Sequence, residues 1–587
     1  MISFHPYKME IYMKEVKFVE PRPTIEIYLP DGRVLQAERN TTLEEILQVL
    51  PEWKNPPIVG AVVNGVLREL TYRVKMDAEV KPLNMADADG ARIYRRSLNF
   101  LLEAAFEDLY PEAKVTIDHA VTSGGFYCQV DGMEEFSTEN LNSLRDHMKN
   151  IVKRNKKIDR MEVPLAEAIE YFNHKGQLDK VQLLKFRNKP HLVLYQLDDQ
   201  KDYHHGYMVP SSGYLEFFEL IWMDSNSFIL QYPRRRSPTV LEKISGNQQL
   251  MKTFQQYGSW LKRLGVDNVG ALNEAIQNDR IRELILVSEA FHEMRIADIA
   301  RKIASDSKRI KIVLIAGPSS SGKTTFSKRL SVQLLAQGIS PFPLEMDNYF
   351  VDRELTPKDE KGDYDFESID ALNHALLDEH LKHLIAGESV QLQKFNFKEG
   401  KSYPGEIVHL DEGQIILLEG IHGLNPKLLE QVPSESTYRI YISCLTQLNL
   451  DRHNRISTTD TRLIRRIVRD ARERGYSAYD TIKRWESVGR GEKRHIFPYQ
   501  DNADEIMNSA LVYELSALRP FVEPLLRQVP YGTSEHVEAK RILSFLEWFL
   551  PINTQLIPDN SILQEFLGAS ILKDFKLWNT NGLDHLR

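Results

Sequence analysis

The stretch that decides the fold of this chain is IVLIAGPSSSGKTT, residues 312–325. Its first five residues are all apolar, as in a strand that is buried on both faces of a parallel sheet. A glycine-rich turn follows, and Lys323 begins a predicted helix that runs through Leu335 and ends at Gly338. A strand, a glycine-rich loop and a helix in this order predict an α/β fold around a parallel sheet.

The turn has the pattern Gly-x-x-x-x-Gly-Lys-Thr. The glycines let backbone N–H groups surround phosphate oxygens at a helix N-terminus, the lysine adds a positive charge, and the threonine hydroxyl ligates Mg²⁺. The pattern therefore predicts a nucleotide-phosphate site with Mg²⁺ as cofactor. The predicted nucleotide-binding residues are Gly317, Pro318, Ser319, Ser320, Ser321, Gly322, Lys323, Thr324 and Thr325.

Such a loop by itself fits kinases, GTPases and motor ATPases alike. The guanine-reading pattern Asn-Lys-x-Asp does not occur at either Asn-Lys pair. Asn155-Lys156 is followed by Lys-Ile, and Asn188-Lys189 by Pro-His, both far from the loop. This disfavours a G protein and favours ATP as the nucleotide.

The composition indicates a multidomain globular protein. The chain has 587 residues, more than one hydrophobic core usually organises, of which 42% are hydrophobic and 27% charged. A formal net charge of −8 argues against a general basic field for nucleic acid or membranes. Met1–Glu20 lacks the unbroken apolar core of a secretory signal, and the two cysteines, Cys128 and Cys444, fit a reducing compartment. We therefore expect a cytoplasmic protein with no membrane contact.

Five segments are predicted along the chain. Residues 1–85 are β-rich, residues 86–240 form an α+β module, and residues 241–305 form a helical connector. Residues 306–510 alternate strands and helices, with candidate parallel strands at Ile310–Ala316, Val390–Phe395, Gln414–Leu418 and Tyr438–Ile442. Residues 511–587 are expected to form packing or interface helices, which leaves a homo-oligomer open.

Two carboxylates follow apolar segments where the carboxyl ends of parallel strands gather a ligand. Asp347, within Leu344–Phe350, is placed to accept a proton from an attacking hydroxyl. Glu419 is the carboxylate at the end of an apolar strand, as in the Walker B element, which holds Mg²⁺ directly or through water. We therefore predict that Thr324 and Glu419 form the metal site. A solvated loop aspartate and an ordinary strand-end glutamate are the alternatives.

Arginines gather between Asp460 and Gly475, in a segment that predicts a helix ending at the glycine. Among them are Arg462, Arg466, Arg469, Arg472 and Arg474. The first three lie at four- and three-residue offsets and hence on one helical face, where guanidinium groups can close over transferring phosphates. A surface basic helix that pairs with nearby acids is the alternative.

In this order the motifs resemble the uridine kinase and phosphoribulokinase family. The motifs are the phosphate loop, Met346–Phe350, Tyr364–Glu367, Leu418–Ile421 and the arginine-rich segment, and they span roughly residues 308–510. The resemblance implies that Asp347 is the catalytic base for a nucleoside 5′-hydroxyl, that Glu367 binds ribose hydroxyls, and that Glu419 assists Mg²⁺. It also implies a lid containing Arg466, Arg469 and Arg474. The predicted catalytic residues are Asp347, Lys323, Arg466 and Arg469; the predicted substrate contacts are Asp347, Tyr349, Glu367, Phe395 and Arg474.

The acceptor base is not specified by these motifs. Phe395–Gly400 ends in a glycine where uridine-cytidine kinases carry a histidine, and Tyr476 stands where the family has an arginine. We therefore expect a small-molecule acceptor that is a nucleoside, with a ribose derivative or a pantothenate-like alcohol as alternatives.

The N-terminal half resembles parts of threonyl-tRNA synthetases. Residues 24–83 are similar to the TGS domain at Leu29–Gly32 and Val63–Gly65, and residues 90–240 to the second additional, editing domain at Leu109–Lys114 and Val209–Gly213. The metal-binding positions of that domain match Arg96, Phe100, His204 and Met208, so at most one ligates a metal and editing hydrolysis is not expected. His204-His205 is instead expected in a polar loop.

The expected fold is thus an α/β P-loop kinase with a parallel sheet, preceded by a small β-grasp-like TGS domain and an α+β editing-like domain. A different hypothesis makes the chain an RNA-associated regulator. In it the N-terminal half makes a weak tRNA or RNA contact, and the phosphate loop serves as a nucleotide switch.

Overall fold

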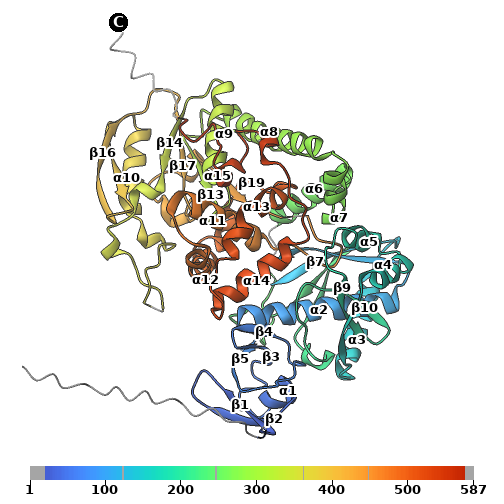
Figure 1. The fold of residues 1–587 in the computed structure, drawn as a ribbon. Coiled ribbons are helices and arrows are strands. Elements are labelled where there is room, and N and C mark those ends of the chain that lie inside the picture. Colours follow the sequence, from blue (N-terminus) through green and yellow to red (C-terminus); the bar gives the residue numbers. More distant parts are fainter. Residues whose placement is uncertain are drawn as a thin grey trace, which may run out of the picture.

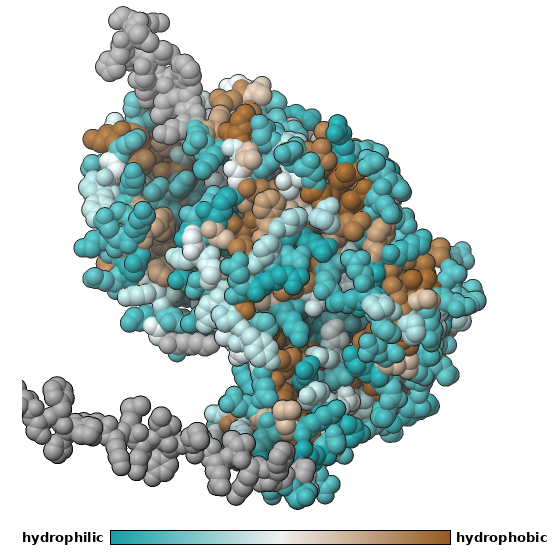
Figure 2. Space-filling view, in the orientation of Figure 1, coloured by the Kyte–Doolittle hydropathy of each residue, from teal (hydrophilic) through white to brown (hydrophobic). Residues whose placement is uncertain are grey.

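The computed structural model describes residues 20, 22–121, 124–244, 248–360, 362–446 and 448–575 (Figure 1). The prediction that Met1–Glu20 carries no secretory signal therefore falls, except for Glu20, outside the described residues. No described helix combines the length and hydropathy that a membrane crossing requires. Hydrophilic side chains cover most of the face shown in Figure 2, and the apolar patches on it are separated from one another.

The first unit is a five-stranded sheet with one short helix, at the bottom of Figure 1. Its strands, in the spatial order β2-β1-β5-β3-β4, are β1 (Thr24–Tyr28), β2 (Val34–Glu38), β3 (Ile58–Val63), β4 (Val66–Arg68) and β5 (Ala78–Asn84). Asn64 and Gly65 turn the chain between β3 and β4 at positive φ angles of 48° and 76°, as the dipeptide predicts. Thr42 and Glu45 form a capping box that starts helix α1 (Leu43–Leu47).

The second unit surrounds the long helix α2 (Ala88–Leu109). One sheet has the order β11-β12-β7-β6 and a second the order β10-β9-β8. The strands are β6 (Lys114–Val121), β7 (Gly125–Asp131), β8 (Ile158–Pro164), β9 (His191–Leu197), β10 (Gln200–Asp202), β11 (Glu219–Asp224) and β12 (Ser227–Gln231). The further helices are α3 (Thr138–Lys153), α4 (Leu165–His174) and α5 (Leu178–Leu184).

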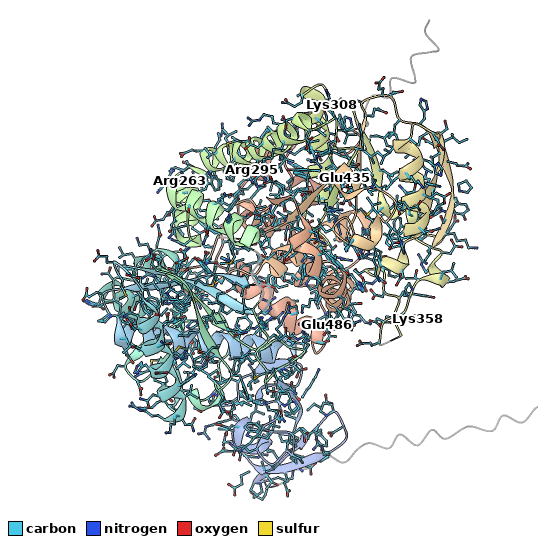
Figure 3. The ribbon with its side chains drawn as sticks, turned by 180° about the vertical axis from the view of Figure 1, so that it is seen from behind. Arg263, Arg295, Lys308, Lys358, Glu435 and Glu486 are labelled. Atoms are coloured by element: carbon cyan, nitrogen blue, oxygen red, sulfur yellow. The ribbon has the colours of Figure 1, made fainter. Side chains whose placement is uncertain are left out.

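Three helices lead to the third unit. They are α6 (Gln248–Leu264), α7 (Val269–Gln277) and α8 (Ile281–Ser305). Helix α8 packs through buried isoleucines on the parallel sheet of the third unit. Its Arg295, labelled in Figure 3, also places Nη2 3.2 Å from Glu505 Oε1 of that sheet. The connector is therefore part of the packing of the parallel sheet.

The third unit is built on a parallel five-stranded sheet with the order β14-β17-β13-β18-β19. Its strands are β13 (Ile312–Ala316), β14 (Pro341–Glu345), β17 (Ile415–Glu419), β18 (Thr437–Ser443) and β19 (Glu505–Asn508). Helices α9 (Lys323–Ala336) and α10 (His374–Ile385) follow β13 and β14 along the chain. Every residue of β13 is buried, because the strand lies in the middle of the sheet. The predicted parallel α/β fold is confirmed.

One predicted strand of that sheet belongs elsewhere. The segment expected at Val390–Phe395 forms β15 (Val390–Asn396), which pairs antiparallel with β16 (Lys401–Val408) in a separate hairpin. Only Val390 of β15 is fully buried. A strand inside a parallel sheet needs both faces buried, and the alternating polar residues of β15 cannot supply that.

The remaining helices cover the third unit and join it to the second. They are α11 (Thr458–Arg474), α12 (Ala478–His495), α13 (Glu514–Leu526), α14 (Ser534–Leu546) and α15 (Gln564–Leu567). One hydrophobic core contains Phe172 and Leu183 of the second unit together with Leu463 of α11 and Phe549 beyond α14. The predicted packing of the C-terminal helices is thus seen against both halves of the chain.

Candidate active site

The phosphate loop connects the end of β13 to the start of α9. A Cβ atom on Gly317 would lie 2.1 Å from the carbonyl oxygen of Ile442, so only glycine lets the loop pass this close to β18. Gly322 has a φ of 87°, in the left-handed region that favours glycine. Both glycines of the pattern are therefore required by the backbone path.

The predicted metal ligands lie next to each other. The Thr324 hydroxyl donates a hydrogen bond to Glu419 Oε1 at 3.1 Å, which joins the start of α9 to the end of β17. Burial raises the pKa of Glu419 to about 7, the Lys323 ammonium opposes the rise, and Asp347 adds to it. A hydroxyl and a carboxylate are the oxygen donors that Mg²⁺ prefers, so these two residues fit that ion.

Asp347 stands at the end of β14, beside the end of β17. A Cβ atom on Gly420 would lie 2.3 Å from Met346 Sδ, so this glycine lets the two strand ends come together. The Asp347 side chain is open to solvent on one side, yet crowding by the protein raises the pKa of its carboxyl. Lys323 and Arg474 oppose that rise, which shows that both cations lie within its electrostatic reach.

Glu367 lies against helix α12 at Gly491. A Cβ atom on Gly491 would lie 2.4 Å from Glu367 Cβ, so α12 leaves room for the glutamate at this glycine. Burial raises the pKa of Glu367 to about 7; Arg466 opposes the rise, and Asp365 and Glu492 add to it. The carboxyl is therefore partly protonated near neutral pH.

Glu367→Gln is expected to stabilise the fold at pH 8 relative to wild type, and not at pH 5. The folded-state pKa of about 7 exceeds the ordinary value of 4.5, so the folded state binds this proton more tightly than the unfolded chain. The stability that this residue contributes is therefore full below about pH 4.5 and is lost as the pH rises through 7, whereas glutamine stays neutral. Thermal unfolding at both pH values measures the difference, with the exposed Glu406→Gln as the matched control. Equal shifts at pH 5 and pH 8 would contradict the assignment.

Two of the predicted substrate contacts, Tyr349 and Phe395, contact other side chains of the protein. Tyr349 is fully buried, and its hydroxyl is 3.0 Å from Nδ1 of His380, so it packs in the core under the hairpin. Phe395 is partly exposed and forms an aromatic cluster, with ring centroids 5.7 Å from Phe350 and 5.0 Å from Phe397. Gly400, which stands where related kinases carry a histidine, leaves room for the Arg353 side chain. A Cβ atom at this position would lie 2.8 Å from the Arg353 guanidinium group.

The arginine helix α11, which carries the three arginines predicted for the lid, packs directly behind the phosphate loop. Arg462 and Arg465 are 1% and 0% exposed. Arg462 Nε donates to the Ser319 carbonyl oxygen at 2.9 Å, and Arg466 Nη1 donates to Ser319 Oγ at 2.9 Å. The helix therefore supports the loop backbone, because its buried guanidinium groups need the acceptors that the loop offers.

Asp470, which was not among the predicted site residues, forms ion pairs with all three arginines predicted for the lid. Asp470 is 2% exposed, and its carboxylate lies 3.2 Å from Arg466 Nε, 3.2 Å from Arg469 Nη2 and 3.4 Å from Arg474 Nη1. Its spacing of four residues from both Arg466 and Arg474 was the available signal. Asp470 therefore holds the guanidinium groups in one place on the loop side of the helix.

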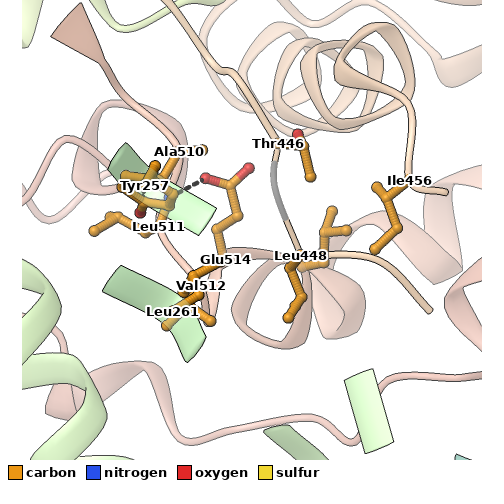
Figure 4. Close-up of a pocket in the computed structure, with 10 residues that line it drawn as sticks. Tyr257, Leu261, Thr446, Leu448, Ile456, Ala510, Leu511, Val512 and Glu514 are labelled. Atoms are coloured by element: carbon orange, nitrogen blue, oxygen red, sulfur yellow. Dashed lines mark hydrogen bonds between the residues drawn. The ribbon is translucent and has the colours of Figure 1, made fainter. Parts of the chain in front are cut away.

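The cavity beside Arg465 is too small for either substrate. Glu514 accepts hydrogen bonds from Arg465 Nη2 at 2.6 Å and from the Leu511 N–H at 2.9 Å, and it faces the apolar residues in Figure 4. The volume there is about 10 Å³, room for one water molecule. This cavity therefore holds neither substrate.

The positions matched to an editing metal site hold a different arrangement. His204 lies in the loop that follows β10, as expected, but it is buried and its Nε2 lies 3.1 Å from Glu103 Oε2. Glu103, Asp202 and His204 lie close enough to share an ion. However, the buried Lys180 ammonium already bonds Asp202 and lies 3.0 Å from His453 Nδ1, in the chain after β18. The cluster joins the second and third units and has its own cation.

The two halves of the chain are similar to different known proteins. The N-terminal half is similar to threonine–tRNA ligases. The ligase of Clostridium kluyveri is 32% identical over 240 residues, which are 40% of this chain and 37% of that protein. The ligase of Fusobacterium nucleatum is 37% identical over 164 residues, 28% of this chain and 26% of that protein. The chain thus spans well under half the length of these relatives.

The C-terminal half has different relatives. A solved structure described as a possible uridine kinase from Bacillus stearothermophilus is 23% identical and covers 24% of this chain and 79% of that one, with a TM-score of 0.21, too low to support a conclusion. The model of the Phosphoribulokinase / Uridine kinase family matches residues 312–515, from β13 to the start of α13. This segment contains the phosphate loop, Asp347, Glu419 and α11. Residues 312–515 are therefore similar to the Phosphoribulokinase / Uridine kinase family and form a P-loop kinase domain.

Proposed function

We propose that this chain transfers the γ-phosphoryl group of MgATP to the 5′-hydroxyl of a nucleoside. The observation that carries the proposal is the meeting of Asp347, Lys323 and Glu419 at the carboxyl edge of the sheet, with the Thr324 hydroxyl 3.1 Å from Glu419. The charge of the phosphate-binding Lys323 acts on both carboxylates, and Glu419 is also hydrogen-bonded to the metal-binding Thr324. That is the arrangement that phosphoryl transfer to an alcohol requires.

The residues of this chain would act as follows. The loop from Gly317 to Thr325 holds the phosphates through its N–H groups, and Lys323 contributes positive charge. Thr324 and Glu419 would hold Mg²⁺, which neutralises charge on the phosphates. Asp347 accepts the proton of the acceptor hydroxyl while a new oxygen–phosphorus bond forms and the bond from the γ-phosphorus to the bridging oxygen breaks. ADP leaves with that bridging oxygen.

Glu367 and the arginines would complete the site. Glu367 is proposed to accept hydrogen bonds from the ribose hydroxyls, and its partial burial beside Gly491 keeps it in a defined position. Arg466, Arg469 and Arg474, gathered by Asp470, are proposed to stabilise negative charge on the transferring group. Arg466 is the best supported of these, since it already contacts Ser319 of the loop.

Release of ADP against a panel of nucleosides, ribose derivatives and pantothenate tests the acceptor. Turnover with one or more nucleosides and not with pantothenate is the expected result. Phosphorylation of a ribose derivative or pantothenate alone would keep the kinase and replace its acceptor. Binding of MgATP without turnover of any acceptor would oppose the proposed reaction.

A contact with RNA is a second proposal, supported by the similarity of the N-terminal half to threonine–tRNA ligases. The formal charge of −8 opposes a strong electrostatic attraction. Filter binding of tRNA over a salt series tests it, because contacts to phosphates weaken steeply as salt rises. Retention that is absent at low salt, or that does not depend on salt, would exclude this contact.

A further inference from the structure

The C-terminal segment of the described chain, residues 561–573, lies against the phosphate loop although it falls outside the matched kinase region. Glu565 Oε2 accepts a hydrogen bond from the Thr325 hydroxyl at 2.9 Å and one from the Thr325 N–H at 3.3 Å. Helix α15, which carries Glu565, is drawn close to α9 and β13 in Figure 1. A carboxylate about 240 residues away along the sequence thus reaches the first turn of α9.

The groups that Glu565 occupies are ones that a nucleotide needs. The first N–H groups of a helix have no partner inside the helix, and in phosphate-binding loops they bind phosphate oxygens. Thr325 is in the first turn of α9, one residue beyond the metal-binding Thr324. A carboxylate at this place satisfies the same donors, and the same positive end of the helix dipole, that a phosphate group would.

Glu565 covers Thr325 but leaves the two residues before it open. Thr325 is 4% exposed, whereas Lys323 is partly exposed and Thr324 is exposed. Within the first turn of α9, Lys323 and Thr324 are therefore open to solvent, whereas Thr325 is covered. At the start of the loop, Glu492 Oε1 accepts the Ser319 N–H at 3.1 Å, so a second carboxylate occupies a second loop donor.

Several contacts hold the segment in place. Arg472 of α11 donates to the carbonyl oxygens of Phe566 and, at 2.9 Å, of Glu565. Lys328 of α9 donates to the carbonyl oxygens of Leu572 and Lys573 at 2.7 and 3.0 Å. The segment is thus clamped between α9 and α11, so that Glu565 is held in position by backbone contacts and not only by its own side chain.

The charge of Glu565 adds to an already acidic site. Glu565 is one of the carboxylates, with Asp347 and Glu345, whose negative charge raises the pKa of Glu419. A nucleotide brings further negative charge to the same place. Mutual repulsion therefore opposes the presence of Glu565 and a phosphate group at Thr325 together.

We propose that Glu565 competes with the donor nucleotide for the Thr325 end of the phosphate loop, so that the C-terminal segment lowers the affinity of the kinase for nucleotide until it is displaced. The proposal rests on the proposed use of this loop to hold MgATP. A segment that merely completed the wall of the site would have the opposite effect, because its removal would weaken binding.

Titration calorimetry of the full chain with MgADP and MgATP tests the sign. Glu565→Gln keeps the shape of the side chain and removes its charge, and it is expected to lower the Kd of both nucleotides about threefold to tenfold. Asp574→Asn is the matched control, since it removes one charge from the exposed end of the same segment and should leave the Kd unchanged. Arg472→Gln, which removes the hydrogen bonds to the Glu565 and Phe566 carbonyl oxygens and leaves the Glu565 side chain unchanged, is expected to lower the Kd as well.

The outcomes separate the two proposals. An unchanged or higher Kd in both Glu565→Gln and Arg472→Gln, with wild-type binding measurable, would overturn the competition and leave the kinase assignment standing. Failure of wild type and all variants to bind either nucleotide would overturn the nucleotide site itself. Melting curves for each variant confirm that the folded protein is being compared.

Discussion

Asp347→Asn is expected to lower kcat about 10²- to 10⁴-fold while the Kd for MgATP stays within about twofold of wild type. Loss of a positioned general base usually costs that much in rate. Asparagine keeps the size of the side chain at the end of β14 but cannot accept the proton of the acceptor hydroxyl. Burial by the surrounding protein raises the pKa of Asp347 above its ordinary value, which makes the carboxylate a stronger proton acceptor than an exposed aspartate.

The measurement is ADP release with the best acceptor of the panel, together with calorimetric titration of MgATP. Asp370→Asn is the matched control, because Asp370 is exposed and lies in the same connection between β14 and α10. A kcat within tenfold of wild type would remove Asp347 from the role of base. A large rise in the Kd for MgATP would instead place it with the nucleotide and its metal ion.

Lys180→Met is expected to lower the free energy of unfolding by about 3–5 kcal/mol, the usual result of breaking a buried ion pair from one side. The Lys180 side chain is fully buried, and its ammonium bonds Asp202 and lies 3.0 Å from His453 Nδ1. The attraction of the ammonium holds the pKa of Asp202 well below its ordinary value against the effect of burial. Methionine fills similar space but leaves the Asp202 carboxylate without a counter-charge.

Denaturant unfolding followed by tryptophan fluorescence measures this change, and the double variant Lys180→Met/Asp202→Asn should recover part of the loss. Lys189→Met is the matched control: Lys189 Nζ lies 2.6 Å from Glu547 Oε2, but both side chains are largely exposed, so the change should stay within about 1 kcal/mol. If the two single variants are equally stable, the buried ammonium does not hold the second and third units together.

The phosphate loop was predictable because its function needs a local backbone path. The pattern Gly-x-x-x-x-Gly-Lys-Thr, the apolar strand before it and the helix after it are all coded within residues 312–338. The positive φ of Gly322 and the close approach of Gly317 to Ile442 are the physical reasons for its glycines. Asp347 and Glu419 could be placed near the loop as well, since the carboxyl ends of parallel strands share one edge.

Other features depend on which faces of the helices and strands are covered by other parts of the protein. The spacing of apolar and polar residues along the sequence does not predict this. The arginines of α11 look like a solvent-facing basic stripe, yet Arg462 and Arg465 are buried because the phosphate loop and Glu514 supply acceptors for them. Tyr349 follows Asp347 by two residues, but the turn Met346–Tyr349 directs it into the core. The sequence correctly predicts a strand at β15. Only its pairing with β16 in the structure shows that this strand belongs to a hairpin outside the parallel sheet.

By itself, then, the sequence determined the parallel α/β fold of the third unit, its phosphate loop and the two carboxylates beside it, because these follow from short-range patterns along single strands, turns and helices. Only the tertiary structure decided that Asp470 gathers the arginines, that Lys180 and Asp202 meet His453, and that Glu565 reaches Thr325. Those contacts join elements far apart along the chain. Their energies depend on burial and on the placement of opposite charges, neither of which local spacing contains.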